Sequence, residues 1–148
     1  MKILVVCQHY WPEPYPLPDI CEELARRGHT VDLITDVPNY PMGITYPKYK
    51  GGARRKEVHN GVNITRTFTI ARRHNAVFRL LNYYSYAWSS SWYASHLKEE
   101  YDVVFTNQTS PIMMSSAAFA YARKHGKKVV MYCMDLWPAC LAAGGLTE

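Results

Sequence analysis

The segment KVVMYC at residues 128–133 leads into DLWP at residues 135–138, and together they decide the fold class. The first segment is short, apolar and rich in β-branched side chains, which is typical of a buried strand. Pro138 is favoured in the first turn of a helix, so a strand is followed by a helix start. In open sheets of parallel strands, ligands bind beyond the carboxyl ends of the strands. Asp135 and Trp137 are therefore expected at a binding site.

The same alternation of strand and helix recurs along the chain. Further strands are predicted at residues 2–7, 30–35, 62–69 and 102–106. Helices are predicted at residues 20–27 and 75–100, and from Ser110-Pro111 to Gly126. This pattern predicts a single α/β domain over residues 1–148, with a Rossmann-like parallel sheet of strand order 3-2-1-4-5 flanked by helices.

Two local signals refine this prediction. Asp19 and Glu22 have the spacing of an N-cap and its N3 partner, and Gly28 is expected to end that helix. Residues 36–60 are predicted to form a long functional loop, closed by an Asn60-Gly61 turn that introduces the third strand.

Composition and charge exclude several classes of protein. Apolar residues make up 48% of the 148 residues and charged residues 20%, as in a folded domain. The net charge of +5 comes from basic pairs that are separated along the chain, whereas a nucleic-acid binder gathers them on one face. Anionic lipid or a phosphate-bearing ligand suits these pairs better, because they flank aromatic segments. The four cysteines form no CxxC pair and are expected to be reduced thiols in a cytoplasmic protein without a signal peptide.

The turn after the first strand carries four prolines and no glycine between residues 8 and 18. A dinucleotide site needs glycines there so that the backbone can approach a pyrophosphate, so this function is excluded. The stiff loop instead places Trp11 and Glu13 at the rim of a pocket. Glu13 is a candidate acceptor of hydrogen bonds from ligand hydroxyls, the alternative being a solvated glutamate.

Polar side chains also follow the fourth strand. Residues 106–110 read TNQTS, and these neutral side chains, Asn107 and Gln108 among them, precede a helix and suit a ligand's hydroxyls or an anion. Asp135 is the best catalytic candidate, as a general base for a hydroxyl, and the alternative is an N-cap. The six histidines show no metal-ligand spacing, so no metal is expected, although His9 lies at the pocket edge.

The segment from Phe78 to Tyr93 is unusually aromatic. Asparagines and serines interrupt its apolar run, so it is not predicted to span a membrane. Aromatic side chains flanked by basic ones suit a membrane surface, and the candidates to face it are Arg72, Arg73, Arg79, Trp88 and Trp92. The alternative is an aromatic helix that packs on its own sheet or on a partner.

Several blocks taken together resemble the N-terminal half of family-four retaining glycosyltransferases, closest to the bacterial WbuB-like or colanic-acid-type surface-polysaccharide group. These blocks are WPEP (11–14), DICEELARRGH (19–29), PNYP (38–41) with Gly43, NGV (60–62), LNY (81–83), QTSP (108–111) and DLWP (135–138). They occur in the family's order through almost the whole chain. The chain departs from relatives at Pro16 and Pro18, at Ala139-Cys140, and at Asn107-Gln108, where some branches have a histidine.

The resemblance implies a GT-B fold in which this chain is the acceptor-side domain and a second domain, absent here, binds the nucleotide sugar. It implies sugar transfer with retention to a cell-surface polysaccharide or lipid-linked saccharide, at the inner face of the plasma membrane, without metal or cofactor. Asp135 would act near the acceptor hydroxyl. Glu13, Tyr40, Asn107, Gln108 and Trp137 would line the acceptor site, with Tyr40 and Trp137 stacking on sugar rings.

This chain alone is expected to be inactive as a transferase. The alternatives are a non-catalytic half-enzyme that recruits a separate donor-binding chain to the membrane, and an inactive truncated remnant.

Overall fold

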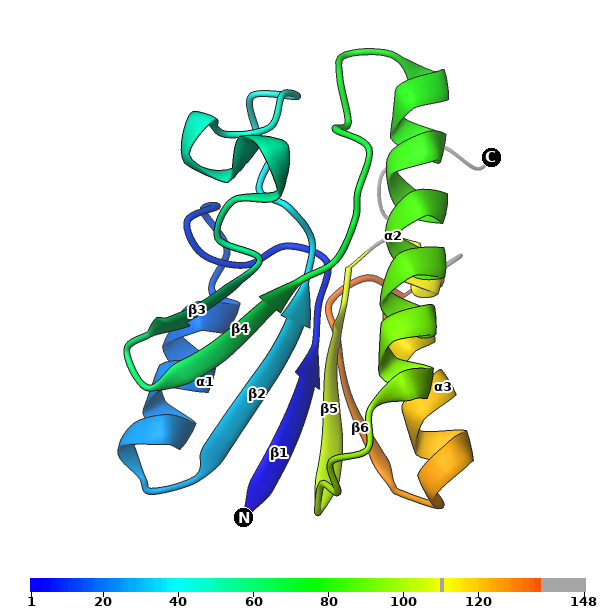
Figure 1. Ribbon diagram of the computed structural model, residues 1–148. Helices are drawn as coiled ribbons and strands as arrows, with labels where there is room; N and C mark the ends of the chain where they lie inside the picture. Colours follow the sequence, from blue (N-terminus) through cyan, green and yellow to red (C-terminus); the bar gives the residue numbers. More distant parts are fainter. Residues whose placement is uncertain (110, 137–148) are drawn as a thin grey trace.

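The computed structural model describes residues 1–109 and 111–136 and contains a six-stranded sheet with helices on both faces (Figure 1). The strands are β1 (Lys2–Val6), β2 (Thr30–Thr35), β3 (Lys56–His59), β4 (Val62–Arg66), β5 (Val103–Gln108) and β6 (Val129–Cys133). The α-helices are α1 (Leu17–Arg26), α2 (Ala76–His96) and α3 (Ser116–His125), and η1 (Pro47–Gly52) and η2 (Ile112–Ser115) are short 3₁₀ helices.

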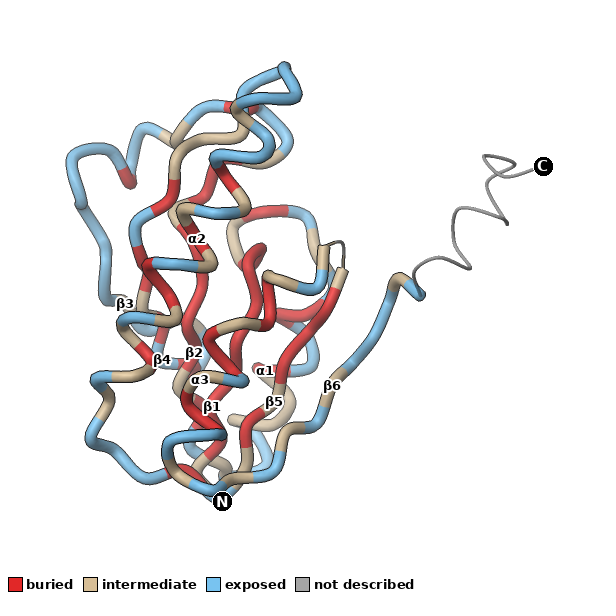
Figure 2. The backbone as a smooth tube through the Cα atoms, turned by 90° about the vertical axis from the view of Figure 1, so that its right-hand side faces the viewer, coloured by how far each residue is buried: buried red, intermediate tan, exposed pale blue. Residues whose placement is uncertain are grey.

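The sheet order is β3-β4-β2-β1-β5-β6. Its five parallel strands follow the predicted order 3-2-1-4-5, which is confirmed. The central strand β1 pairs with β2 on one side, as Ile3 with Val31, and with β5 on the other, as Ile3 with Val103. Figure 2 shows β1 and β2 largely buried, whereas β6 at the edge is mostly exposed.

Alternate side chains of β1 enter two separate cores. Ile3, Val5 and Cys7 pack with α1 through Leu17 and Cys21. Leu4 and Val6 face the other way and pack with α2 and α3, where Ala94, Ala117 and Tyr121 are buried. Because successive side chains of a strand point to opposite faces, a run that is apolar throughout demands helices on both sides.

The first helix begins earlier than predicted. It starts at Leu17 rather than Ile20, so Asp19 lies in its first turn and is not its N-cap. Pro16 occupies the cap position without a side-chain hydrogen bond, and Pro18 falls within the first turn, where the fixed φ of proline suits a helix start. The proline-rich turn therefore sets the start of this helix in place of the capping pair.

The long segment 36–60 is not structureless. It contains η1 and the strand β3, which pairs antiparallel with β4. The turn between them is Asn60-Gly61, with φ of 46° and 83°, as a tight type I′ hairpin requires. The predicted turn is thus confirmed, and it closes a β-hairpin that adds one antiparallel edge strand.

Helix α2 begins after Asn75, whose side chain accepts a hydrogen bond from the backbone N–H of Phe78. It ends at His96, four residues before the predicted boundary. Its buried face packs on the sheet, where the Tyr86 hydroxyl donates to the carbonyl of Cys7 at 2.9 Å. Trp88 and Trp92 lie on the opposite face and are 71% and 59% exposed. Among the described helices, none is long and apolar enough to cross a membrane.

Candidate functional site

Polar side chains are buried at the carboxyl edge of three neighbouring strands, and a fourth strand adds a half-buried one. Gln8 and His9 follow β1, Asp36 follows β2, and Asn107 and Gln108 end β5; each of the five is at most 5% exposed. Next along the sheet, β6 pairs Cys133 with Gln108 and leads to the half-buried Asp135. Because β2, β1, β5 and β6 are consecutive in the sheet, these side chains form one row along the edge where ligands bind in such folds.

Glu13 joins two of the loops at this edge. One carboxylate oxygen accepts hydrogen bonds from the backbone N–H groups of Asn39 and Tyr40, at 2.6 and 2.7 Å. The other oxygen lies 2.8 Å from Nδ1 of His9. Glu13 is only 3% exposed, so it is not a solvated loop residue. It holds the loop after β1 against the loop after β2, and a contact with ligand hydroxyls stays a prediction.

Three side-chain amides extend this network to α2. The side chain of Gln8 donates to Oδ1 of Asn82 at 2.7 Å, and Asn82 in turn donates to the carbonyl of Ile70 at 2.7 Å. Oδ1 of Asn39 accepts from the backbone N–H of Arg72 at 3.0 Å. The loops after β1, β2 and β4 and the helix α2 are therefore joined by side chains that are almost fully buried.

Arg66, at the end of β4, fixes the same loops from the other side. Its guanidinium donates to the carbonyls of Trp11 and Asp36, at 2.7 and 3.2 Å, and forms an ion pair with Glu57 at 2.7 Å. Only 1% of its side chain is exposed. A buried charge that is paired and hydrogen-bonded in this way gives the edge a rigid frame.

Asp36 is the most perturbed carboxyl group of the edge. Burial raises its pKa well above the ordinary value, and the nearby Glu13 raises it further. The charge of Arg66 and a hydrogen bond from the Asn39 side chain at 3.1 Å oppose this shift without cancelling it. The protonated form of Asp36 is therefore favoured over a wider pH range than in an exposed aspartate.

Three side chains of types that can ligate a metal lie close together here. Their spacing in the sequence did not indicate this proximity. His9, Glu13 and Asp36 each offer one atom, and these atoms lie within 4.8 Å of one another. Both oxygens of Glu13 already face N–H donors or the imidazole ring. The arrangement therefore fits a hydrogen-bonded network, and its donor set is not free to coordinate an ion.

Four buried polar atoms along this edge have no hydrogen-bond partner among the described residues. They are Oε1 of Gln8, Nε2 of His9, Oδ1 of Asp36 and Oδ1 of Asn107. An unpaired buried polar atom costs about 1–3 kcal/mol. In native folds such atoms commonly pair with water or with a bound molecule.

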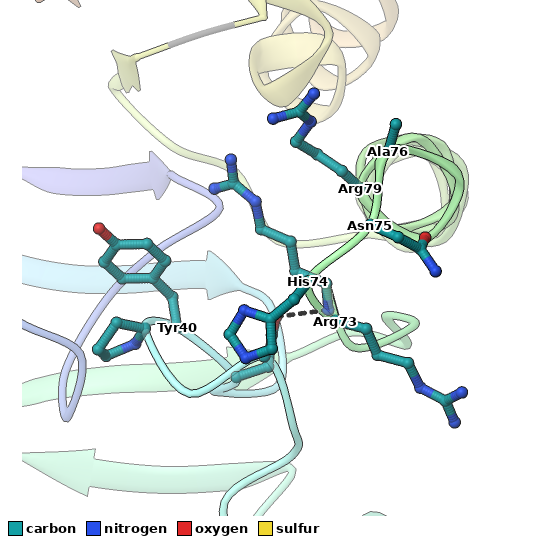
Figure 3. Close-up of a pocket in the computed structure, with 10 residues that line it drawn as sticks. Tyr40, Arg73, His74, Asn75, Ala76 and Arg79 are labelled. Carbon is teal, nitrogen blue, oxygen red and sulfur yellow. Dashed lines mark hydrogen bonds between the residues drawn. The ribbon is translucent and has the colours of Figure 1, made fainter.

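A pocket of about 440 Å³ opens beside this network, between the loop after β2 and the start of α2 (Figure 3). It is lined by Asn39, Tyr40, Pro41, Gly43, Arg72, Arg73, His74, Asn75, Ala76 and Arg79. Tyr40 forms one wall and its ring centroid lies 5.7 Å from that of His9. The pocket and the network therefore share a wall.

The predicted site residues that the structure describes fall into four places. Asn107, Gln108 and Asp135 lie at the ends of β5 and β6, whereas Glu13 and Tyr40 lie beyond β1 and β2. Arg72, Arg73 and Arg79 line the pocket, but Trp88 and Trp92 line a separate cavity of about 400 Å³ further along α2. Trp137 lies outside the described residues.

Sequence reasoning did not single out Gln8, Asp36, Asn39, Arg66 or Asn82. Asn39 and Asn82 each lie in a block that carried the family resemblance, and Asp36 directly follows a predicted strand. Membership of these blocks, and the position directly after a strand, are the sequence signals that pointed to Asn39, Asn82 and Asp36.

Comparison with solved structures places the fold among known α/β domains. Two crystal structures of the C-terminal domain of a hydrogenase from Pyrococcus furiosus are similar to this chain. The first has a TM-score of 0.52 at 17% identity and covers 88% of this chain and 90% of that one. The second has a TM-score of 0.51 at 15% identity, with 88% and 89% covered. At such identities the likeness concerns the fold alone.

Comparison of sequences gives the family. No curated protein matches this chain at a significant level. The family model described as a glycosyl transferase 4-like domain matches residues 17–146, which is most of the chain. That match includes the loops after β2 and β5 and helix α2, which carry much of the polar edge. The chain therefore belongs to the glycosyl transferase 4-like domain family, and it is a glycosyltransferase-type module.

Proposed function

We propose that this chain is the acceptor-side domain of a GT-B glycosyltransferase. The enzyme would transfer a sugar from a nucleotide-sugar donor, with retention, to a cell-surface polysaccharide or lipid-linked saccharide. The donor would bind in a second, C-terminal domain. Membership of the glycosyl transferase 4-like family supports transfer of a sugar in general. Assignment to the WbuB-like or colanic-acid-type group rests on the sequence blocks and belongs to the proposal.

The observation that carries the proposal is the row of four unpartnered polar atoms at the carboxyl edge of the sheet. Two are amide oxygens, which accept hydrogen bonds. The Asp36 oxygen accepts or donates according to its protonation, and the imidazole nitrogen of His9 does so according to its tautomer. Sugar hydroxyls both donate and accept hydrogen bonds, so they match an edge that carries polar groups of both kinds. Tyr40 offers an aromatic face beside them, as sugar rings require for stacking.

In this proposal Asp135 lies next to the reacting acceptor hydroxyl. It follows β6, whose pairing with β5 places it on the same side of the sheet edge as Asn107 and Gln108. A carboxylate there would accept the hydroxyl proton or orient the hydroxyl toward the donor. Asn107 and Gln108 would position the acceptor, and Trp137 would form the further aromatic wall.

We place the enzyme in the cytoplasm, at the inner face of the plasma membrane. No aspartate or glutamate occurs between residues 58 and 98, so the whole of α2 and the segment before it carry only basic charge. This segment also exposes aromatic side chains at Phe68, Trp88 and Trp92. Basic charge combined with exposed aromatic rings favours an anionic lipid surface.

This function is tested by measuring sugar transfer by the protein expressed from its natural gene. Native membranes would supply the acceptor, and radiolabelled UDP-glucose, UDP-galactose, UDP-N-acetylglucosamine and GDP-mannose would be the donor probes. We expect incorporation from at least one donor. Asn107→Ala should lower kcat/KM about tenfold, since one hydrogen bond to the substrate is worth about 0.5–1.5 kcal/mol.

Asn63→Ala is the matched control. Asn63 lies near the start of β4, at the opposite edge, and within the described residues its side chain hydrogen-bonds to Asp32 alone. Its substitution should leave transfer unchanged. Equal activity of N107A and N63A would show that the acceptor does not bind at the end of β5. Transfer catalysed by residues 1–148 alone would contradict donor binding in a second domain.

A further inference from the structure

We propose that the pocket beside Tyr40 binds a phosphate or diphosphate group, which on the proposed function is the one carried by the acceptor. Arg72 and Arg79 would be its ligands. The pocket's lining contains three arginines and one histidine but no acidic residue. A cavity of about 440 Å³ is large enough for a diphosphate together with part of the group attached to it.

The arginines of this pocket have no carboxylate partner within the described chain. Of the six arginines elsewhere in the chain, Arg26, Arg27, Arg54 and Arg66 each lie within 4.0 Å of a glutamate oxygen. No such ion pair involves Arg72, Arg73 or Arg79 among residues 1–109 and 111–136. Several cationic groups held close together without a counter-charge repel one another, and an anion relieves that repulsion.

Arg72 is held in place by the buried network. Its backbone N–H donates to Oδ1 of Asn39 at 3.0 Å. Its guanidinium carbon lies 5.9 Å from the ring centre of Tyr40 and 5.5 Å from that of Tyr83, and the residue is half-buried. A planar guanidinium between aromatic rings is partly desolvated and restricted in its rotamers, which favours bidentate binding of phosphate oxygens.

Arg79 reaches the pocket from the second turn of α2. Figure 3 shows Arg79 and Tyr40 on opposite sides of the pocket, while the side chain of Arg73 turns away from it. The guanidinium carbon of Arg73 instead lies 4.2 Å from the ring centre of Phe78, and its backbone N–H donates to the carbonyl of Gly43. The two ligating guanidinium groups are therefore those of Arg72 and Arg79, and Arg73 adds charge.

The position of the pocket identifies what carries the anion. Asn39 and Tyr40 line the pocket and also contact Glu13, whose partner His9 belongs to the polar edge. A phosphate in the pocket therefore lies beside Tyr40, which we assign to the acceptor sugar. An acceptor whose sugar is linked to a lipid through phosphate or diphosphate fits both places at once.

The test is equilibrium binding of inorganic pyrophosphate to the purified protein, measured by calorimetry and by chemical-shift changes. We expect Arg72→Gln and Arg79→Gln each to weaken binding about tenfold, and raised salt to weaken it further. Arg123→Gln removes the same charge from the last turn of α3 and should leave binding unchanged. Pyrophosphate binding that is equal in R72Q, R79Q and R123Q would overturn the proposal.

Two further probes distinguish the sources of the phosphate. Farnesyl diphosphate, which joins a diphosphate to an isoprenoid chain, should bind more tightly than pyrophosphate and lose affinity in R72Q and R79Q. Vesicles of phosphatidylglycerol report attraction to a lipid headgroup surface, where R72Q and R79Q should each weaken binding only by the loss of one surface charge. If only the vesicles respond to R72Q and R79Q, the pocket is not a phosphate site. Because these measurements need no sugar transfer, they are independent of the test of the proposed function.

Discussion

At the scale of single residues, Asp36 shows how burial in the site changes the protonation of a carboxyl group. Its carboxyl group is 1% exposed, and one of its oxygens has no partner among the described residues. The raised pKa means that the folded state holds the proton more tightly than the unfolded chain. The contribution of Asp36 to stability is therefore fully present below its ordinary pKa of about 4, and it is lost as pH rises through the raised value.

Asp36→Asn should make this pH dependence disappear, because an amide resembles the protonated acid. We expect the free energy of unfolding of D36N to exceed that of the wild type by a margin that grows as pH rises above about 4. Urea denaturation across a pH series measures the difference. Asp19→Asn, which removes an exposed carboxylate of α1, is the control. A D36N difference that is constant with pH would show that Asp36 ionises normally in the folded protein.

Glu13 differs from Asp36, because its carboxylate accepts hydrogen bonds from backbone N–H groups and so stabilises the fold. Glu13→Ala would leave the N–H groups of Asn39 and Tyr40 without their acceptor. We expect a loss of about 2–4 kcal/mol in the free energy of unfolding, from two charge-assisted bonds and a buried donor left unpaired. Glu13→Gln keeps one carbonyl oxygen and should lose less. Equal stability of E13A and wild type would show that the loops do not depend on this residue.

At the scale of elements, the sequence predicted the parallel strands and not the antiparallel one. Runs such as KILVV in β1 are apolar throughout and are recognisable without knowledge of neighbours. The strand β3 reads KEVH, and it exists because the Asn60-Gly61 turn folds it onto β4. Its polar composition resembles that of a loop, so only the turn indicated it.

The same distinction applies to the site. Asn107, Gln108 and Asp135 could be named because each ends or follows a recognisable strand. The hydrogen bonds that join Glu13, Asn39 and Asn82 could not be predicted from the sequence. They join three segments whose proximity depends on how α2 docks on the sheet. Sequence position predicts the edge on which a residue lies, whereas hydrogen-bond partners depend on tertiary packing.

The start of α2 offers a test at this scale. Asn75→Ala removes the acceptor for the N–H of Phe78, a bond of 2.8 Å, and should cost about 1 kcal/mol of stability. Chemical denaturation measures the loss. Asn75→Ser retains a capping oxygen and should cost only a few tenths of that amount. A difference between N75A and N75S in hydrogen-exchange protection of the first turn of α2 would locate the effect at the cap. Equal stability of N75A and N75S would contradict the prediction.

At the scale of the whole molecule, one side of α2 exposes a continuous apolar strip. Val77, Leu80, Leu81, Tyr84, Trp88 and Trp92 are all exposed, at helical spacing. Near its end the strip meets a cavity that is also lined by Phe68, Arg55 and Lys56. Apolar patches of this kind, rimmed by basic side chains, occur where proteins bind other surfaces.

Trp88→Ser combined with Trp92→Ser should reduce binding of the protein to phosphatidylglycerol vesicles by at least about tenfold, since aromatic rings supply much of the interfacial binding energy. Co-sedimentation measures the bound fraction. Phe119→Ser, which alters an exposed aromatic residue of α3, is the matched control. Vesicle binding that is equal in both variants would show that the strip does not bind the membrane.

The pairing of β1 with β5 has a consequence for the order in which the molecule forms. Ile3 lies opposite Val103, and the hydroxyl of Thr106 donates to the carbonyl of Val6 across the same pair. At a synthesis rate of about 5–20 residues per second, the central strand waits about 5–20 s for the neighbour on that side. During that time β2, α1 and then α2 shield β1, and its edge toward β5 is open to wrong partners. Contacts so distant in the chain also slow folding from the denatured state. The half formed by β1, α1, β2 and the β3–β4 hairpin is therefore expected to collapse first, with β5 as the last inner strand to join the sheet.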